Sequence, residues 1–211
     1  MTIDRRALLS RGLVAGAAIS SATVAAVAGP RNAARLQLDP ALPGLAITPS
    51  LDNQSARLQA AIEATSAQGA ALVLPAGTFR AAGVTLRPGT RIVGSGRSTV
   101  LEFSGGETFL SAENAAGISI ENLTIDGANL GLDAASTTGL IHLRDCQNIV
   151  LRDIHIRRSL LNGLSLERCS GRVSDCSISD VAQTGLFSLD AIGLELLHNR
   201  ISHCDNNGIQ V

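Results

Sequence analysis

A repeat with a period of 22 or 23 positions fills the C-terminal half of this 211-residue chain. One strand-like segment of the repeat returns at Ile141, Leu164, Leu186 and Ile209, so its spacing is nearly constant. A second segment carries aliphatic residues at its first, third and eighth places and a polar residue at its fifth. Such short strands cannot bury a face alone, so successive copies must stack. With Asn and Gly at the corners and no helical periodicity between them, the strands predict an all-β parallel β-helix from about Ala71 onward.

The repeat also predicts which residues lie above one another in successive coils. Two inward aliphatic columns are expected: Ile120, Leu151, Val173 and Leu196, and Ile125, Ile156, Ile178 and Ile201. Charges of opposite sign should alternate along the stack, as neighbouring strands favour. The expected pairs are Glu121 with Arg152, Asp126 with Arg157, Asp145 with Arg168, and Arg144 with Glu167 and then Asp190. An apolar column of Cys146, Cys169 and Ile192 follows from the same spacing.

Composition agrees with thin coils filled by aliphatic side chains. Aromatic residues make up 2% of the chain, with four Phe and no Trp or Tyr. The formal charge is −1, so the chain has no electrostatic footprint for nucleic acid or for an anionic membrane surface.

The segment 1–28 is typical of an export signal. Arg5 and Arg6 form a twin-arginine pair, a weakly apolar run from Gly12 to Val27 follows, and a small-x-small cleavage site ends at Ala28. The run is shorter than the roughly 20 residues that span a bilayer, so no stable membrane span is expected in the mature chain. The sequence predicts transport by the twin-arginine translocation machinery to the periplasm or the medium. A short membrane anchor and an ordinary exported leader are the alternatives.

Residues 29–50 contain several prolines and are expected to form a linker before a β-helix domain at 51–211. One capping helix is predicted from Asn53 to Gln68, because an N-cap cluster precedes apolar residues at helical spacing. Short strands should follow, separated by turns. Gly94-Ser95-Gly96 is predicted to be one of these turns, because a strand-like run follows it where a nucleotide-binding loop needs a helix.

Two segments of this region carry a family resemblance. The order of helix, Leu74-Pro75-Ala76-Gly77-Thr78-Phe79 and Arg91-Ile92-Val93-Gly94-Ser95-Gly96 resembles the opening of the pectate-lyase-like right-handed β-helix superfamily. With the leader and the repeats, the whole chain resembles the twin-arginine-translocated β-helix repeat proteins. The resemblance implies a right-handed solenoid whose N-terminal end is covered by the helix, and it specifies fold much more than chemistry.

The C-terminus and the cysteines lead to two further expectations. The sequence stops on the strand-like Asn207 to Val211 without a closing cap, which suggests the N-terminal portion of a longer protein. The four cysteines are expected to be buried, inert thiols, because twin-arginine substrates fold where thiols stay reduced. A disulfide between Cys146 and Cys169, one rung apart, is the alternative.

The fifth place of the repeat forms the strongest candidate site. Asn122, Asp153, Asp175 and His198 occupy it in successive copies. In one interpretation it is a corner column whose side chains bond to neighbouring rungs. In the other, Asp153, Asp175 and His198 are catalytic, because adjacent carboxylates raise one pKa or recruit a cation and a nearby His can share the proton.

A basic patch should face outward beside this column. Its members are Arg152, His155, Arg157, Arg158 and Arg200. Guanidinium groups bind carboxylates in a fork, so the patch could hold an acidic polysaccharide. The alternative is a solvated surface whose charges the neighbouring rungs already neutralise. The long connection from Asp126 to Gly139 could border a binding side or be an ordinary turn.

These features lead to two functional hypotheses. The first is an exported protein that binds or modifies a polysaccharide, as a lyase, hydrolase or epimerase by analogy with the superfamily. The second is a non-catalytic solenoid for adhesion or envelope structure. The polygalacturonase signatures and the Asp-Pro-His-Asp of alginate epimerases do not occur, and no Cys/His cluster has metal-ligand spacing. The sequence names no cofactor.

Overall fold

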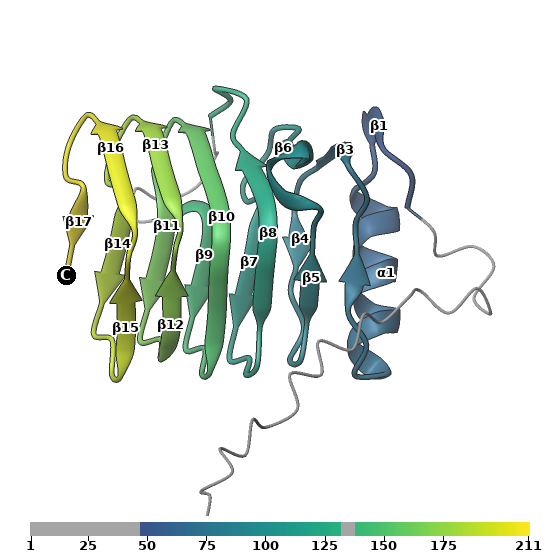
Figure 1. Ribbon diagram of the computed structural model, residues 1–211, viewed down its shortest axis with the longest axis horizontal. Helices are drawn as coiled ribbons and strands as arrows, with labels where there is room; N and C mark the ends of the chain where they lie inside the picture. Colours follow the sequence, from purple (N-terminus) through teal and green to yellow (C-terminus); the bar gives the residue numbers. More distant parts are fainter. Residues whose placement is uncertain (1–46, 132–137) are drawn as a thin grey trace, which may run out of the picture. The chain divides into compact units, whose positions relative to one another are not determined.

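The computed structural model describes residues 47–131 and 138–211, which form a parallel β-helix of six coils (Figure 1). This confirms the predicted fold class. The elements in chain order are β1 (Ser50–Asn53), α1 (Ser55–Ala67), β2 (Leu72–Val73), β3 (Gly77–Ala81), β4 (Val84–Thr85), β5 (Arg91–Val93), η1 (Gly96–Ser98, a 3₁₀ turn), β6 (Thr99–Phe103), β7 (Leu110–Glu113), β8 (Ser119–Asp126), β9 (Gly139–Arg144), β10 (Ile149–Ser159), β11 (Asn162–Glu167), β12 (Gly171–Ser174), β13 (Ser177–Val181), β14 (Leu186–Leu189), β15 (Leu194–Leu197), β16 (Arg200–Cys204) and β17 (Ile209–Gln210).

Each coil contributes to three faces, and all strand pairs are parallel. Face 1 is the row β2, β5, β8, β10, β12, β15. Face 2 is the row β1, β3, β6, β8, β10, β13, β16. Face 3 is the row β4, β7, β9, β11, β14, β17. Strands β8 and β10 run through faces 1 and 2, whereas in the next two coils a corner separates β12 from β13 and β15 from β16 (Figure 1).

Both predicted inward columns are confirmed. On face 1, Leu151 pairs with Ile120 and Val173, and Val173 pairs with Leu196. On face 2, Ile156 pairs with Ile125 and Ile178 in the same way, and Ile178 pairs with Ile201. Most of these side chains have no exposed surface, so the columns form the centre of the core.

A column of glycines at the start of face 3 lets the chain pass close to the isoleucines of face 2. Gly163 and Gly185 lie one coil apart, because Leu164 pairs with Leu186. A Cβ atom on Gly185 would lie 2.5 Å from Cγ2 of Ile201 and 2.8 Å from the carbonyl oxygen of Gly208. The glycine of the repeat is therefore needed for a close approach of backbone to side chain.

Polar residues occupy the corners because the backbone there is left-handed. Their φ angles lie between 50° and 57°. The residues are Asn122, Asp153, Asp175 and His198 between faces 1 and 2 (the first corner), Arg158, Asp180 and His203 after face 2 (the second corner), and Asn114, Asp145, Arg168 and Asp190 after face 3 (the third corner). Asn and Asp tolerate this conformation better than most residues, because their short side chains bond locally. The fifth place of the repeat is thus a position where the strand bends.

The helix α1 packs against the first coil and covers that end of the β-helix (Figure 1). It buries Leu58, Ala61 and Ile62. The predicted range of 53–68 extends beyond the helix at both ends, and at its start Asn53 ends strand β1 and its side chain accepts the Ser55 N–H at 2.9 Å. Strand β1 itself pairs with β3 and was not predicted. Among the described residues, no helix is long and apolar enough to cross a membrane.

Two predicted stacking positions are wrong. Glu167 pairs with Leu189 and not with Asp190, and Ile192 is 83% exposed and not in an apolar column with the buried Cys146 and Cys169. Both errors come from applying the longer period of the repeat to a coil that is one position shorter. The other charge pairs are confirmed, with Arg168 and Asp145 joined by two hydrogen bonds of 2.7 and 2.8 Å. All four cysteines are free thiols, and three of them are buried.

Candidate functional site

A pocket of about 250 Å³ lies on the outward side of face 2, where β8, β10 and β13 run side by side. We call it the His155 pocket. Its side chains are of two kinds, cationic or titratable groups and small hydroxyl groups. They are Arg97, His155, Arg157, Asp180, Thr124, Ser177 and Ser179. The hydroxyl groups make a low floor, because Thr124 and Ser177 are the neighbours of His155 on the adjacent strands.

The imidazole of His155 is half-buried, and Arg97 and Arg157 line the same pocket. Burial lowers its pKa below the ordinary value of 6.5, and the charges of Arg97 and Arg157 lower it further, while Asp153 opposes them. His155 is therefore neutral at neutral pH. A neutral imidazole can accept a proton from a bound molecule and return it, which is the role of a general base.

Arg157 is held in place by the buried carboxylate of Asp126. Its Nε–H donates to Oδ2 of Asp126 at 2.8 Å, and Arg158 donates its Nε–H to Oδ1 at 2.7 Å. Asp126 has no exposed surface. Burial alone would raise its pKa, but the Arg158 hydrogen bond, the Ala128 N–H and both arginine charges lower it overall. Because Arg157 uses only Nε here, its two terminal nitrogens remain available to the pocket.

Arg97 supplies the second guanidinium, from the turn η1. Among the described residues, no carboxylate lies within 4.0 Å of it. Its backbone carbonyl accepts the Thr124 hydroxyl at 3.1 Å, which ties the turn to face 2. A guanidinium without a carboxylate partner can bind an anion without first breaking an ion pair.

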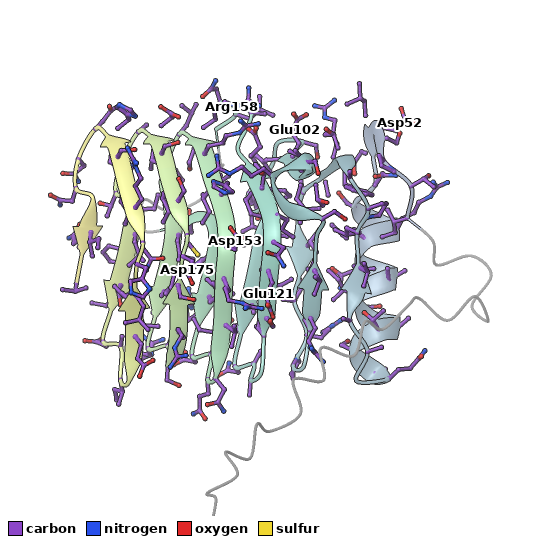
Figure 2. The ribbon with its side chains drawn as sticks, in the orientation of Figure 1. Asp52, Glu102, Glu121, Asp153, Arg158 and Asp175 are labelled. Carbon is purple, nitrogen blue, oxygen red and sulfur yellow. The ribbon has the colours of Figure 1, made fainter. Side chains whose placement is uncertain are left out.

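The first corner borders face 2, the face on whose outward side this pocket lies. Figure 2 shows Asp153 and Asp175 on neighbouring coils, with Arg158 and Glu102 at the opposite edge of face 2. His198 follows on the next coil, and its Nδ1 lies 3.5 Å from Oδ1 of Asp175. The three predicted catalytic residues are thus brought into one column. They are exposed and occupy left-handed corners, so their positions have a conformational explanation as well as a chemical one.

The residues of the predicted basic patch are distributed over different faces of the β-helix, and three of its arginines are paired with carboxylates. Arg152 bonds to Glu121 on face 1, and Arg157 and Arg158 bond to Asp126. Arg200 lies on the same outward column as His155, with Ser177 between them. Of the five predicted residues, His155, Arg157 and Arg200 share the outward side of face 2. Arg158 lies at the second corner, and Arg152 belongs to face 1.

Sequence reasoning missed Arg97, Ser177 and Ser179 and gave Asp126 only an ion pair. Arg97 lies 58 positions before His155 and outside the regular repeat, so no spacing rule connects them. The alternation of β13 could have indicated the serines, since Ser177 and Ser179 flank the inward Ile178.

Several predictions lie outside the described residues. Arg5, Arg6 and Ala28 precede residue 47, and the long connection is described only as far as Gly131 and again from Thr138. In the described part of the chain, no three His, Cys, Asp or Glu side chains are grouped to hold a metal ion.

The chain belongs to the family described as the right-handed β-helix region, whose sequence model matches residues 78–211. The match begins within β3 and runs through all later coils, and it agrees with the predicted handedness.

Two solved structures show the same fold. The chain is similar to the A-module of mannuronan C-5 epimerase AlgE4 of Azotobacter vinelandii, with a TM-score of 0.70 and 19% identity over 78% of this chain and 50% of that one. It is also similar to the A-module of AlgE6 of the same organism, with a TM-score of 0.57 and 19% identity over 78% of this chain and 56% of that one. The chain therefore spans about half the length of these two modules.

Proposed function

We propose that this protein binds an acidic polysaccharide at the His155 pocket and exchanges a proton with the bound sugar through His155. The observation that carries the proposal is a neutral imidazole in a pocket that two arginines also line, one of which, Arg97, has no carboxylate partner among the described residues. A sugar with a carboxylate fits this arrangement, because Arg97 and the terminal nitrogens of Arg157 can hold the carboxylate while His155 lies beside the ring.

The similar solved modules support the choice of substrate class. Both are named as epimerases of mannuronan, a polysaccharide of uronic acid units. Epimerisation and elimination both begin with removal of a proton from the carbon next to the carboxylate. Charge develops on that carboxylate as the proton leaves, so an arginine that binds it stabilises the transition state. The exposed Asp153, Asp175 and His198 of the first corner are further acid–base candidates within the same surface.

Binding is tested by titrating the full chain with oligomannuronate in a calorimeter. We expect Arg97→Gln to weaken binding by about tenfold, and added salt to weaken it in the unmodified protein. Arg57→Gln is the matched control, because Arg57 is an exposed arginine on α1, far along the chain from the pocket. Equal affinities for the two variants, or no binding by either, would contradict the proposal.

Proton transfer is tested by incubating the same oligosaccharide with the protein in D₂O. Deuterium should enter at the carbon next to the carboxylate, and His155→Gln should abolish the exchange while leaving the arginines in place. Binding without exchange would refute the proton-transfer half of the proposal and leave a polysaccharide-binding solenoid.

We also propose that residues 1–28 direct export by the twin-arginine route. Exchanging Arg5 and Arg6 for Lys should retain the protein inside the cell, as measured by fractionation and immunoblotting. A protein that reaches the periplasm equally well with both substitutions does not use that route.

A further inference from the structure

A second hollow lies on face 1, on a different side of the β-helix from the His155 pocket. Its volume is about 680 Å³, within the range of ligand sites in proteins. The side chains that matter for its shape are Glu121, Arg152, Arg172, Ser174, Ile192 and Glu195. None of the proposed chemistry of face 2 uses this hollow.

The hollow lies between two ion pairs whose arginines extend in opposite directions along the stack of coils. Arg152 on β10 reaches back to Glu121 on β8, whereas Arg172 on β12 reaches forward to Glu195 on β15. The register between β10 and β12 places Arg152 beside Ser174. No long side chain therefore fills the space between the two pairs, and Ser174 forms part of its floor.

The ion pairs that line the hollow leave both hydrogen-bond donors and acceptors unused. Arg172 bonds to Glu195 through Nε at 2.8 Å and Nη2 at 2.6 Å, and both bonds end on Oε2. Arg152 likewise uses Nε and Nη2 on Oε2 of Glu121. The remaining nitrogen of each arginine and Oε1 of Glu195 are thus unused in these pairs. All three side chains are more than half exposed, so these atoms are accessible to a ligand.

This arrangement favours an uncharged ligand that carries hydroxyl groups. The two arginines and two glutamates cancel, so neither an anion nor a cation meets a net opposite charge. A hydroxyl group both donates and accepts, and a pair of adjacent hydroxyls can bond to a guanidinium N–H and a carboxylate oxygen together. Ile192, which is 83% exposed, and Val150 add an aliphatic border for the C–H face of a sugar ring. We propose that face 1 binds neutral sugar units of a glycan in this hollow.

The test uses the full chain and cello-oligosaccharides, which are neutral and unbranched. We expect saturation-transfer and chemical-shift NMR to show binding at β10, β12 and β15 that added salt and Arg97→Gln leave unchanged. Two variants should weaken binding by about tenfold or more: Ser174→Leu, which fills the hollow, and Ile192→Ser, which removes its aliphatic border. Leu51→Ser is the control, because Leu51 is also a largely exposed aliphatic residue but belongs to β1.

Ile192→Ser should fold normally, because a side chain so exposed contributes little to the core, and a loss of binding by this variant therefore reports on the hollow. The same variants should bind oligomannuronate as the unmodified protein does, which separates this hollow from the His155 pocket. The proposal is overturned if cello-oligosaccharides cause no shifts on face 1, or if Ile192→Ser binds them as Leu51→Ser does. Strong weakening of the binding by salt would also overturn it.

Discussion

Arg157 donates its Nε–H across 2.8 Å to a carboxylate, Asp126, that has no exposed surface. The same carboxylate accepts a hydrogen bond from Arg158, which also approaches Glu102, and Glu102 pairs with Arg80 at 3.1 Å. A buried carboxylate with two cationic donors fixes the guanidinium that faces His155. The pocket on face 2 is therefore supported by a network that extends over several coils.

Asp126→Asn should lower the free energy of unfolding by about 2 kcal/mol, because two charge-assisted hydrogen bonds become neutral ones. Urea denaturation near pH 7 measures this loss. Glu113→Gln is the control, since Glu113 is 60% exposed and its pair with Arg144 is long, so the loss there should stay below about 0.5 kcal/mol.

The Asp126 contribution should also depend on pH. Because the folded protein lowers the pKa of Asp126 below 3.8, its stabilising effect is complete above about pH 5 and is lost on further acidification. The stability difference between the unmodified protein and Asp126→Asn should therefore shrink toward low pH. A difference that stays constant down to about pH 3 would contradict the lowered pKa.

His155 should also make the free energy of unfolding depend on pH, in a higher pH range than Asp126 does. Burial and two arginines lower its pKa below 6.5, so the unfolded chain binds a proton more readily than the folded protein. The free energy of unfolding should consequently fall as the pH drops below about 6.5. Urea unfolding of His155→Gln at about pH 8 and about pH 5.5 should show a smaller decrease than the unmodified protein. Equal decreases would show that His155 is not the responsible group.

Asp175 lies in a left-handed corner, with φ of 56°. Asp175→Asn should leave stability unchanged or raise it, because Asn accepts this conformation and a carboxylate beside Asp153 is removed. Asp175→Val should cost about 1–2 kcal/mol, because a β-branched side chain is strained there. Thermal unfolding measures both changes. Ser177→Val, on the extended strand of the same coil, serves as the control and should be tolerated.

The catalytic or cation-binding interpretation of the same corner can be tested with these variants. If Asp153 and Asp175 hold a cation, Ca²⁺ should raise the melting temperature of the unmodified protein and leave that of Asp175→Asn unchanged. Calorimetry of the unmodified protein with and without Ca²⁺ decides this, and superimposable curves would end the cation hypothesis.

Gly185→Ala should destabilise the fold by about 1–3 kcal/mol, because the new Cβ would lie 2.5 Å from Cγ2 of Ile201. Gly208→Ala is a matched control on the next coil, since the nearest atom to its Cβ would be 3.8 Å away. Chemical denaturation of both variants should show a loss for Gly185→Ala alone. Equal losses would mean that general glycine flexibility, and not the close approach, is responsible.

The stacking of the last four coils could be predicted because their period is nearly constant. Paired residues on face 3 lie 23, 22 and 23 positions apart there, and the alternation of aliphatic residues decides which side chains face inward. The stacking of the first two coils was not predicted, because the spacing there is irregular: Val84 pairs with Leu110 after 26 positions and Leu110 with Ile141 after 31. Where the period shortened by one position, the predicted places of Asp190 and Ile192 were wrong.

The sequence by itself determined the fold class, the inward columns and most cross-rung charge pairs, because each depends on residue type at a repeated spacing. It also placed Asp153, Asp175 and His198 in one column. Only the tertiary structure decided what surrounds His155. Arg97 belongs to a turn outside the repeat and Ser177 to the next coil, and winding the chain into stacked coils is what brings them to the same pocket. In a stacked fold, residues far apart in the sequence become neighbours in successive coils. The lengths of the irregular connections determine which residues become neighbours.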